Sequence, residues 1–302
     1  MKSNYRYIVK AFMAMAVIAG TTSCDDFLDR EPMSSISPET YYSTAAQLEA
    51  NLNDEYPNVL PSFGQWTYGI FGEDKGTDNQ IEVNANDRYT QDRWKVPHSE
   101  SDNWKFERIY RINFFLSEAL PKFGEDMSGS QNTISGSVAT IKHYIGEMYF
   151  LRAYEYFKKL QLFGDFPIIN QPLADEMEAL REASKRFPRN EVARFIISDL
   201  DKAYAYMSDV DMATTRINKD AAMLVKSRVA LFEATWLQNF KGTAFVPGGE
   251  GWPGASLHNN YQYPSGNIDN EVKYFLEQAV EASKLVADKY KGSLTENTGV
   301  LQ

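Results

Sequence analysis

Cys24 is the only cysteine of the 302-residue chain, and its surroundings indicate what its thiol does. A basic start is followed by an apolar stretch over 11–20 and by the small residues of 21–23. This is the layout of a secretory signal peptide, and its apolar part is too short to cross a bilayer. A cysteine directly after the small residues is typical of bacterial lipoproteins, in which the thiol is acylated and becomes the new N-terminus. The sequence therefore predicts a signal peptide over 1–23, lipidation at Cys24 and a tether over 24–36; a secreted protein with a stray buried cysteine is the alternative.

Patterns that would indicate catalysis are missing from the sequence. His98, His143 and His258 are far apart and lack metal-binding spacing, and there is neither a glycine-rich phosphate loop nor a Gly-x-Ser-x-Gly elbow. The 41 acidic residues do not single out the carboxylate pair of a glycosidase. The net charge of −10 argues against nucleic acid as a partner. We expect no enzyme, no cofactor and no metal site; a hydrolase stays a minor alternative.

Aromatic residues in glycine- and proline-rich polar segments are the strongest sign of binding. They are Trp66, Tyr68, Trp94 and Trp252. A flat apolar ring beside hydrogen-bonding side chains matches a sugar, which carries C–H bonds on one face and hydroxyl groups around its edge. These four residues are therefore candidate glycan contacts. The alternative is that they pin their loops onto neighbouring helices.

Six segments with helical periodicity must position these loops. They cover 37–56, 101–120, 137–164, 189–207, 218–240 and 269–290. Ser37 and Asn190 are the expected N-caps of the first and fourth helices. Trp104 and Trp236 would lie within helices and belong to the core.

The last four helices read as two repeated pairs. The first helices of the two pairs start near 138 and 219, and their partners start near 190 and 271. The number of residues between the two first helices therefore equals the number between the two partners. Small residues where helices cross, with aromatic residues around them, indicate tetratricopeptide-like hairpins. Long insertions are expected at 57–99, 163–188 and 241–269, and they form the candidate working face. An unrelated helical bundle is the alternative.

Several stretches, in the same order, resemble the SusD/RagB outer-membrane lipoproteins. The start CDDFLDREP resembles the beginning of the mature family members, and GEMYFLRAYEYFKKLQLFGDFPII resembles the most recognisable family segment. The stretches FIISDLDKA and RINKDAAMLVKSRVALFEA resemble later helices of the family. The resemblance covers nearly all of the chain after Cys24.

The resemblance implies a mostly α fold, a SusD-like α-α superhelix of tetratricopeptide-like hairpins with long inserted loops. It implies a non-enzymatic protein that captures oligosaccharides or polysaccharides and covers a SusC-like, TonB-dependent transporter. The lipid on Cys24 would anchor it in the outer membrane, facing the cell exterior. The segment KGTDN resembles a position where the family often has two polar residues, which adds Asp78 and Asn79 to the candidate glycan contacts.

The chain departs from the family in length. Members usually continue with a further helical pair and a mixed C-terminal region, so we expect 37–302 to be a SusD-like helical-repeat domain lacking the usual C-terminal part. A last pair without a cap would expose an apolar face, which predicts marginal solubility. A helical-repeat adaptor that binds the transporter and has no sugar site of its own is the alternative function.

Overall fold

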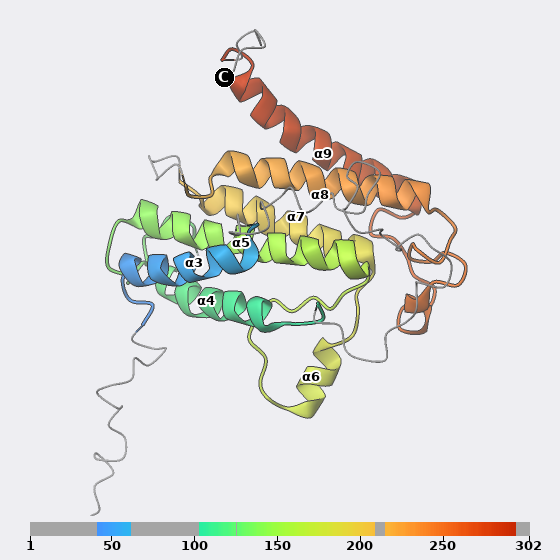
Figure 1. The fold of residues 1–302 in the computed structure, drawn as a ribbon, viewed down its shortest axis with the longest axis horizontal. Coiled ribbons are helices and arrows are strands. Elements are labelled where there is room, and N and C mark those ends of the chain that lie inside the picture. Colours follow the sequence, from blue (N-terminus) through green and yellow to red (C-terminus); the bar gives the residue numbers. More distant parts are fainter. Residues whose placement is uncertain (1–40, 62–102, 125, 209–214, 294–302) are drawn as a thin grey trace, which may run out of the picture. The chain divides into compact units, whose positions relative to one another are not determined.

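The computed structural model describes residues 41–61, 103–124, 126–208 and 215–293. The helices of the described residues all belong to one compact unit, Tyr42–Gln302. These are α3 (Ala45–Val59), α4 (Glu107–Phe123), α5 (Val138–Phe163), α6 (Met177–Ala183), α7 (Arg189–Tyr206), α8 (Lys219–Asn239), the short 3-10 helix η3 (Pro253–Ser256) and α9 (Ile268–Tyr290) (Figure 1). No described residue belongs to a β-strand; there are only two isolated bridges. The expected mostly α fold is confirmed.

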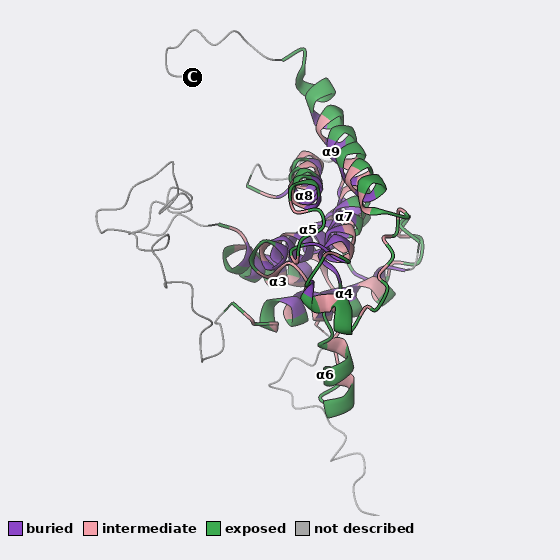
Figure 2. Cartoon of the chain, turned by 90° about the vertical axis from the view of Figure 1, so that its right-hand side faces the viewer, coloured by how far each residue is buried: buried purple, intermediate pink, exposed green. Residues whose placement is uncertain are grey.

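The two predicted hairpins are α5/α7 and α8/α9. Each pair packs along its length, and α7 against α8 joins one hairpin to the next. Helices α3 and α4 pack on the other side of α5, so that α5 lies in the middle (Figures 1 and 2). All four helices begin within one residue of the segments expected for them.

The boundaries of α5 follow from its sequence. Ser137 caps the start by accepting a hydrogen bond from the backbone N–H of Thr140. Gly164 ends the helix at a φ of 66°, a left-handed conformation that glycine adopts without steric cost. Most residues between them are buried, because neighbouring helices cover α5 on several sides.

The first expected helix starts later than predicted. Residues 41–43 form a turn, and Thr44 is the N-cap of α3. The Thr44 hydroxyl accepts from the backbone N–H of Gln47, while the Gln47 side chain accepts from the N–H of Thr44. This reciprocal capping box fixes the start of α3. The expected cap, Ser37, lies outside the described residues.

The second expected helix was wrong at both ends. Helix α4 begins at Glu107 rather than near 101, so Trp104 precedes it and packs its ring against Phe163 and Phe166, each 4.9 Å away. The helix also continues past Pro121. A proline in the last turn removes only one backbone donor, and the N–H of Gly124 still closes the helix on Leu120.

Asn190 is inside α7 and is not its N-cap, which corrects the expectation for the fourth helix. Its buried side chain donates to the hydroxyl of Tyr261 and to Glu271. Pro188 precedes the helix instead, and the Asp165 carboxylate accepts from the backbone N–H of Arg189. A side chain distant in sequence therefore satisfies a donor that local capping leaves open.

Small residues bring the helices of a hairpin close, as predicted. At Gly146 of α5 a Cβ atom would lie 2.8 Å from the backbone nitrogen of Met207 and 3.0 Å from the carbonyl oxygen of Ala203. In α8/α9 the corresponding approach places the Ser227 hydroxyl 3.0 Å from the carbonyl oxygen of Ala279. The buried side of α9 faces α8, while its outer side is exposed (Figure 2).

Candidate functional site

The predicted insertions 163–188 and 241–269 meet in the structure and enclose a cavity of about 760 Å³ where α5 and α8 end. We call it the loop cleft. It is lined by Gln161, Leu162, Phe163, Gly164, Asp165, Arg186, Arg189, Trp236, Ala244, Phe245, Trp252, Pro253, Gly254 and Leu257. An antiparallel bridge between Phe166 and Phe187 closes the base of the insertion 163–188, and α6 lies inside it.

Trp252 forms part of the wall of the loop cleft, with only 5% of its surface exposed. Its indole N–H donates to the Asp165 carboxylate at 2.8 Å, and its ring stacks on His258 with the ring centres 6.0 Å apart. Gly254 lies so close that a Cβ atom there would be 2.2 Å from the indole ring. These contacts favour a loop-pinning role for Trp252, and its contact with a glycan stays a prediction.

The open side of the cleft carries Phe245, which is 61% exposed. The indole N–H of Trp236 donates to the carbonyl oxygen of Phe245 and so holds that loop against α8. Phe240 packs between them, with ring-centre distances of 4.6 Å to Trp236 and 5.4 Å to Phe245. Trp236, Phe240 and Phe245 together form an apolar platform, whose surface matches one face of a sugar ring.

The charged groups of the cleft are largely engaged with one another. Burial raises the pKa of Asp165, although the hydrogen bonds from Trp252 and from the backbone of Arg189 oppose this. The Arg189 guanidinium binds Glu233 through two nitrogens and lies 4.0 Å from the ring centre of Trp236. Asp165 is the only carboxylate among the described residues that line the cleft.

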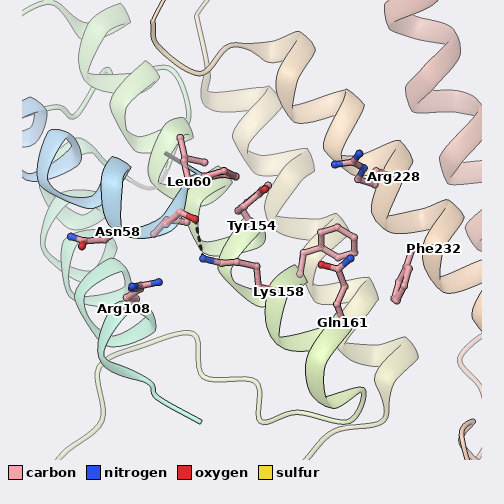
Figure 3. Close-up of a pocket in the computed structure, with 11 residues that line it drawn as sticks. Asn58, Leu60, Arg108, Tyr154, Lys158, Gln161, Arg228 and Phe232 are labelled. Carbon is pink, nitrogen blue, oxygen red and sulfur yellow. Dashed lines mark hydrogen bonds between the residues drawn. The ribbon is translucent and has the colours of Figure 1, made fainter. Parts of the chain in front are cut away.

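A second cavity of about 750 Å³ lies between α3, α4, α5 and α8, and we call it the cationic groove (Figure 3). It is lined by Asn58, Val59, Leu60, Pro61, Arg108, Tyr154, Phe157, Lys158, Gln161, Arg228 and Phe232. Sequence reasoning missed it, because its charged residues come from three helices that are far apart in the sequence. Arg228, four residues before Phe232 in α8, was the only local signal.

Comparison with known proteins assigns the family. A model of the SusD-like_3 family, described as starch-binding and associating with the outer membrane, matches residues 26–231. The chain belongs to this family. The SusD-like match includes the groove residues other than Phe232 and the insertion 163–188, while Trp236 and the insertion 241–269 lie beyond it.

Curated relatives and solved structures carry the same family name. SusD-like proteins P25 and P2 of Formosa agariphila are each 25% identical, over 233 and 253 residues that cover 71% and 80% of this chain. The chain spans less than half of their length, 41% and 46%. Among solved structures, a SusD-like carbohydrate-binding protein from Bacteroides vulgatus is similar at a TM-score of 0.49 and 14% identity, covering 85% of this chain and 47% of that one. A SusD-like protein from Bacteroides fragilis gives 0.43 and 18%, covering 70% and 40%.

Five of the six expected glycan contacts belong to the insertion 57–99. Trp66, Tyr68, Asp78, Asn79 and Trp94 lie outside the described residues, and these contacts stay predictions. The same holds for lipidation at the single cysteine and for the signal peptide and tether. Within 41–61, 103–124, 126–208 and 215–293, no three His, Cys, Asp or Glu side chains form a potential metal site. No helix in this part is long and apolar enough to span a bilayer.

Proposed function

We propose that this protein captures oligosaccharides or polysaccharides at the cell surface and delivers them to a SusC-like, TonB-dependent transporter. It acts by binding, without chemistry of its own. The family match over 26–231 carries this proposal, because the family is described by starch binding and by association with the outer membrane. The lipoprotein layout around Cys24 supports a lipid anchor in that membrane, with the protein facing the exterior.

Within the described residues, the loop cleft is the proposed glycan site. Phe245 and Trp236 offer an apolar platform, and the exposed Arg186 is a hydrogen-bond donor at its edge. The Trp252–Asp165 hydrogen bond holds the two insertions together, so that the platform has a defined shape. The predicted contacts at Trp66, Tyr68, Asp78, Asn79 and Trp94 would add to this site from the insertion 57–99.

Migration through native gels cast with different polysaccharides tests glycan capture. The sample is the mature chain, residues 24–302, carrying Cys24→Ser, and retardation by at least one polysaccharide is expected. Phe245→Ala should weaken that retardation about tenfold, because it removes the exposed half of the platform. Tyr110→Ala is the control, since this α4 residue is half exposed and lies outside the loop cleft.

The predicted contacts outside the described residues have their own variant. Trp66→Ala with Trp94→Ala should abolish the retardation if those rings stack on sugar. A folded sample that no polysaccharide retards would contradict glycan capture and favour the adaptor function, in which the transporter is the only partner. Release of reducing sugar by the purified chain would overturn the non-catalytic proposal.

A further inference from the structure

We infer that the cationic groove is a second subsite, which takes a carboxylate- or sulfate-bearing unit of the glycan bound in the loop cleft. This inference rests on the proposed function and names the class of glycan: an anionic polysaccharide. Four observations carry it: the residues that line the groove, their charge balance, their aromatic neighbours and the continuity of the groove with the loop cleft.

The groove presents three cations and no carboxylate among the described residues that line it. Arg108 comes from α4, Lys158 from α5 and Arg228 from α8. Figure 3 shows Arg108 and Arg228 on opposite sides of the α5 surface that carries Tyr154, Lys158 and Gln161. An anionic group entering the groove would therefore meet positive charge from more than one direction.

Neighbouring acids do not cancel this positive charge. The buried Glu155 carboxylate lies 2.6 Å from Lys158, 3.3 Å from Lys159 and 3.9 Å from Arg108. One carboxylate thus faces three cations, and Arg108 is 48% exposed. Arg228 has no acidic partner within the described part of the chain. The groove therefore carries an excess of positive charge, although the net charge of the whole protein is −10. A polyanion would be repelled by the protein as a whole and attracted only at such a local excess.

The remaining lining residues match a saccharide. Tyr154 and Phe232 supply half-buried aromatic surface over the buried ring of Phe157, while Gln161 supplies a side-chain amide. Lys158 is held in place, since its ammonium group also donates to the carbonyl oxygen of Val59 at 2.9 Å. Arginine binds carboxylate and sulfate oxygens through paired N–H donors, so exposed guanidinium groups suit this ligand class.

The groove and the loop cleft adjoin. Gln161 lines both of them. The aromatic side chains also run from one to the other, with ring-centre distances of 5.7 Å between Phe157 and Phe232 and 5.9 Å between Phe232 and Trp236. A single oligosaccharide can therefore contact the platform with one unit and the cations with another. This continuity favours a glycan over an acidic peptide as the occupant of the groove.

Isothermal titration of the mature chain, residues 24–302 carrying Cys24→Ser, tests the inference with matched polymers. Polygalacturonate is compared with its methyl ester, and dextran sulfate with dextran, so that each pair differs in charge; poly-glutamate is the peptide arm. At least one anionic polysaccharide should bind about tenfold more tightly than its neutral counterpart. Which pair shows the preference distinguishes carboxylate from sulfate.

The double variant Arg108→Gln with Arg228→Gln should bind the anionic polysaccharide about tenfold more weakly, which removes the preference. Arg228→Lys keeps the charge and should weaken this binding less. Arg181→Gln with Lys185→Gln removes the same net charge from the exposed α6 region and should leave the preference unchanged. No anionic preference, or a preference that the groove variant keeps, overturns the inference while neutral glycan capture stands. Poly-glutamate binding as tight as the polysaccharide overturns the saccharide assignment. No binding of any polysaccharide overturns the proposed function as well.

Discussion

The two stacked hairpins neutralise their buried charges differently. In α5/α7, Arg152 of the first helix binds Asp199 of the second through two hydrogen bonds of 2.6 and 2.8 Å. In α8/α9, the two fully buried carboxylates are Glu233 and Glu271, and both pair with arginines of α7. The Arg152–Asp199 pair thus lies within the first hairpin, whereas both buried carboxylates of the second depend on its neighbour. Glu147 of α5 pairs outside its hairpin, with Arg216.

The repeat makes this difference informative. Glu233 of the second hairpin corresponds to Arg152 of the first, and Glu271 corresponds to Asn190, because the offset that relates the two hairpins separates both pairs. Positions that correspond in the repeat therefore carry different charges. A buried carboxylate without a counter-ion is strongly destabilising, so α8/α9 is expected to fold only against α7. The buried carboxylates of α8/α9 therefore require a neighbouring helix that carries arginines at the matching positions, as α7 does.

Removing the counter-ion of Glu233 should have the largest effect on stability. Burial raises the pKa of Glu233, although Arg189 opposes this, so the carboxylate depends on the guanidinium to stay charged. Arg189→Met is expected to lower the free energy of unfolding by about 3–5 kcal/mol. Urea denaturation followed by circular dichroism measures this loss. Helices α8 and α9 are expected to unfold at the lowest urea concentrations.

A double variant separates lost pairing from lost packing. Arg189→Met with Glu233→Met replaces the buried pair by apolar side chains, and it should recover most of the stability lost in the single variant. Arg181→Met breaks an exposed pair with Glu178 and should cost less than about 1 kcal/mol. Equal losses in the single and double variants would mean that the arginine acts through its packing on Trp236 alone.

The helices could be predicted from the sequence because apolar periodicity and caps are local. Helices α5, α8 and α9 follow from such signals, with Ser137, Asn218 and Asn267 as caps. Partners distant in sequence decided the rest. The backbone donor of Arg189 is satisfied by Asp165 from another loop, which frees Asn190 for the helix interior.

The site was predictable only where its residues share a loop. Trp252 stands out beside glycine and proline, and the structure does place it in the wall of a cavity. Which face of its ring is covered depends on Asp165 and His258, whose proximity no local pattern encodes. The cationic groove combines Arg108 of α4 with Arg228 of α8, so only the packing of the helices brings it together.

Crowding the contact inside the first hairpin should have an intermediate effect. Gly146→Ala would place a Cβ atom against the backbone of Met207 and Ala203, which cannot yield as a flexible side chain could. A loss of about 1–3 kcal/mol in the free energy of unfolding is expected from overpacking. Gly292→Ala is the control, because a Cβ atom there meets nothing within 4 Å. A stability equal to that of the control would show that the α5/α7 crossing can shift enough to accommodate the added methyl group.

The smallest effect is expected at Glu271, because its partner Arg194 is 25% exposed and solvent screens the pair. Burial disfavours the charged form of Glu271, but hydrogen bonds from Arg194, Asn190 and Ser265 outweigh it and lower the pKa below its ordinary value of 4.5. The unfolded chain therefore takes up this proton more readily than the folded one.

The stability that Glu271 contributes is fully present above pH 4.5 and is lost as the pH falls through the lower pKa of the folded state. Glu271→Gln keeps the shape of the side chain and removes the titration, so its free energy of unfolding should fall less steeply with acid below pH 4.5. Glu277→Gln, on the exposed side of α9, should keep the slope of the unmodified chain. Parallel slopes for all three proteins would mean that folding does not lower the pKa of Glu271, so that the Arg194–Glu271 pair does not contribute to the acid sensitivity.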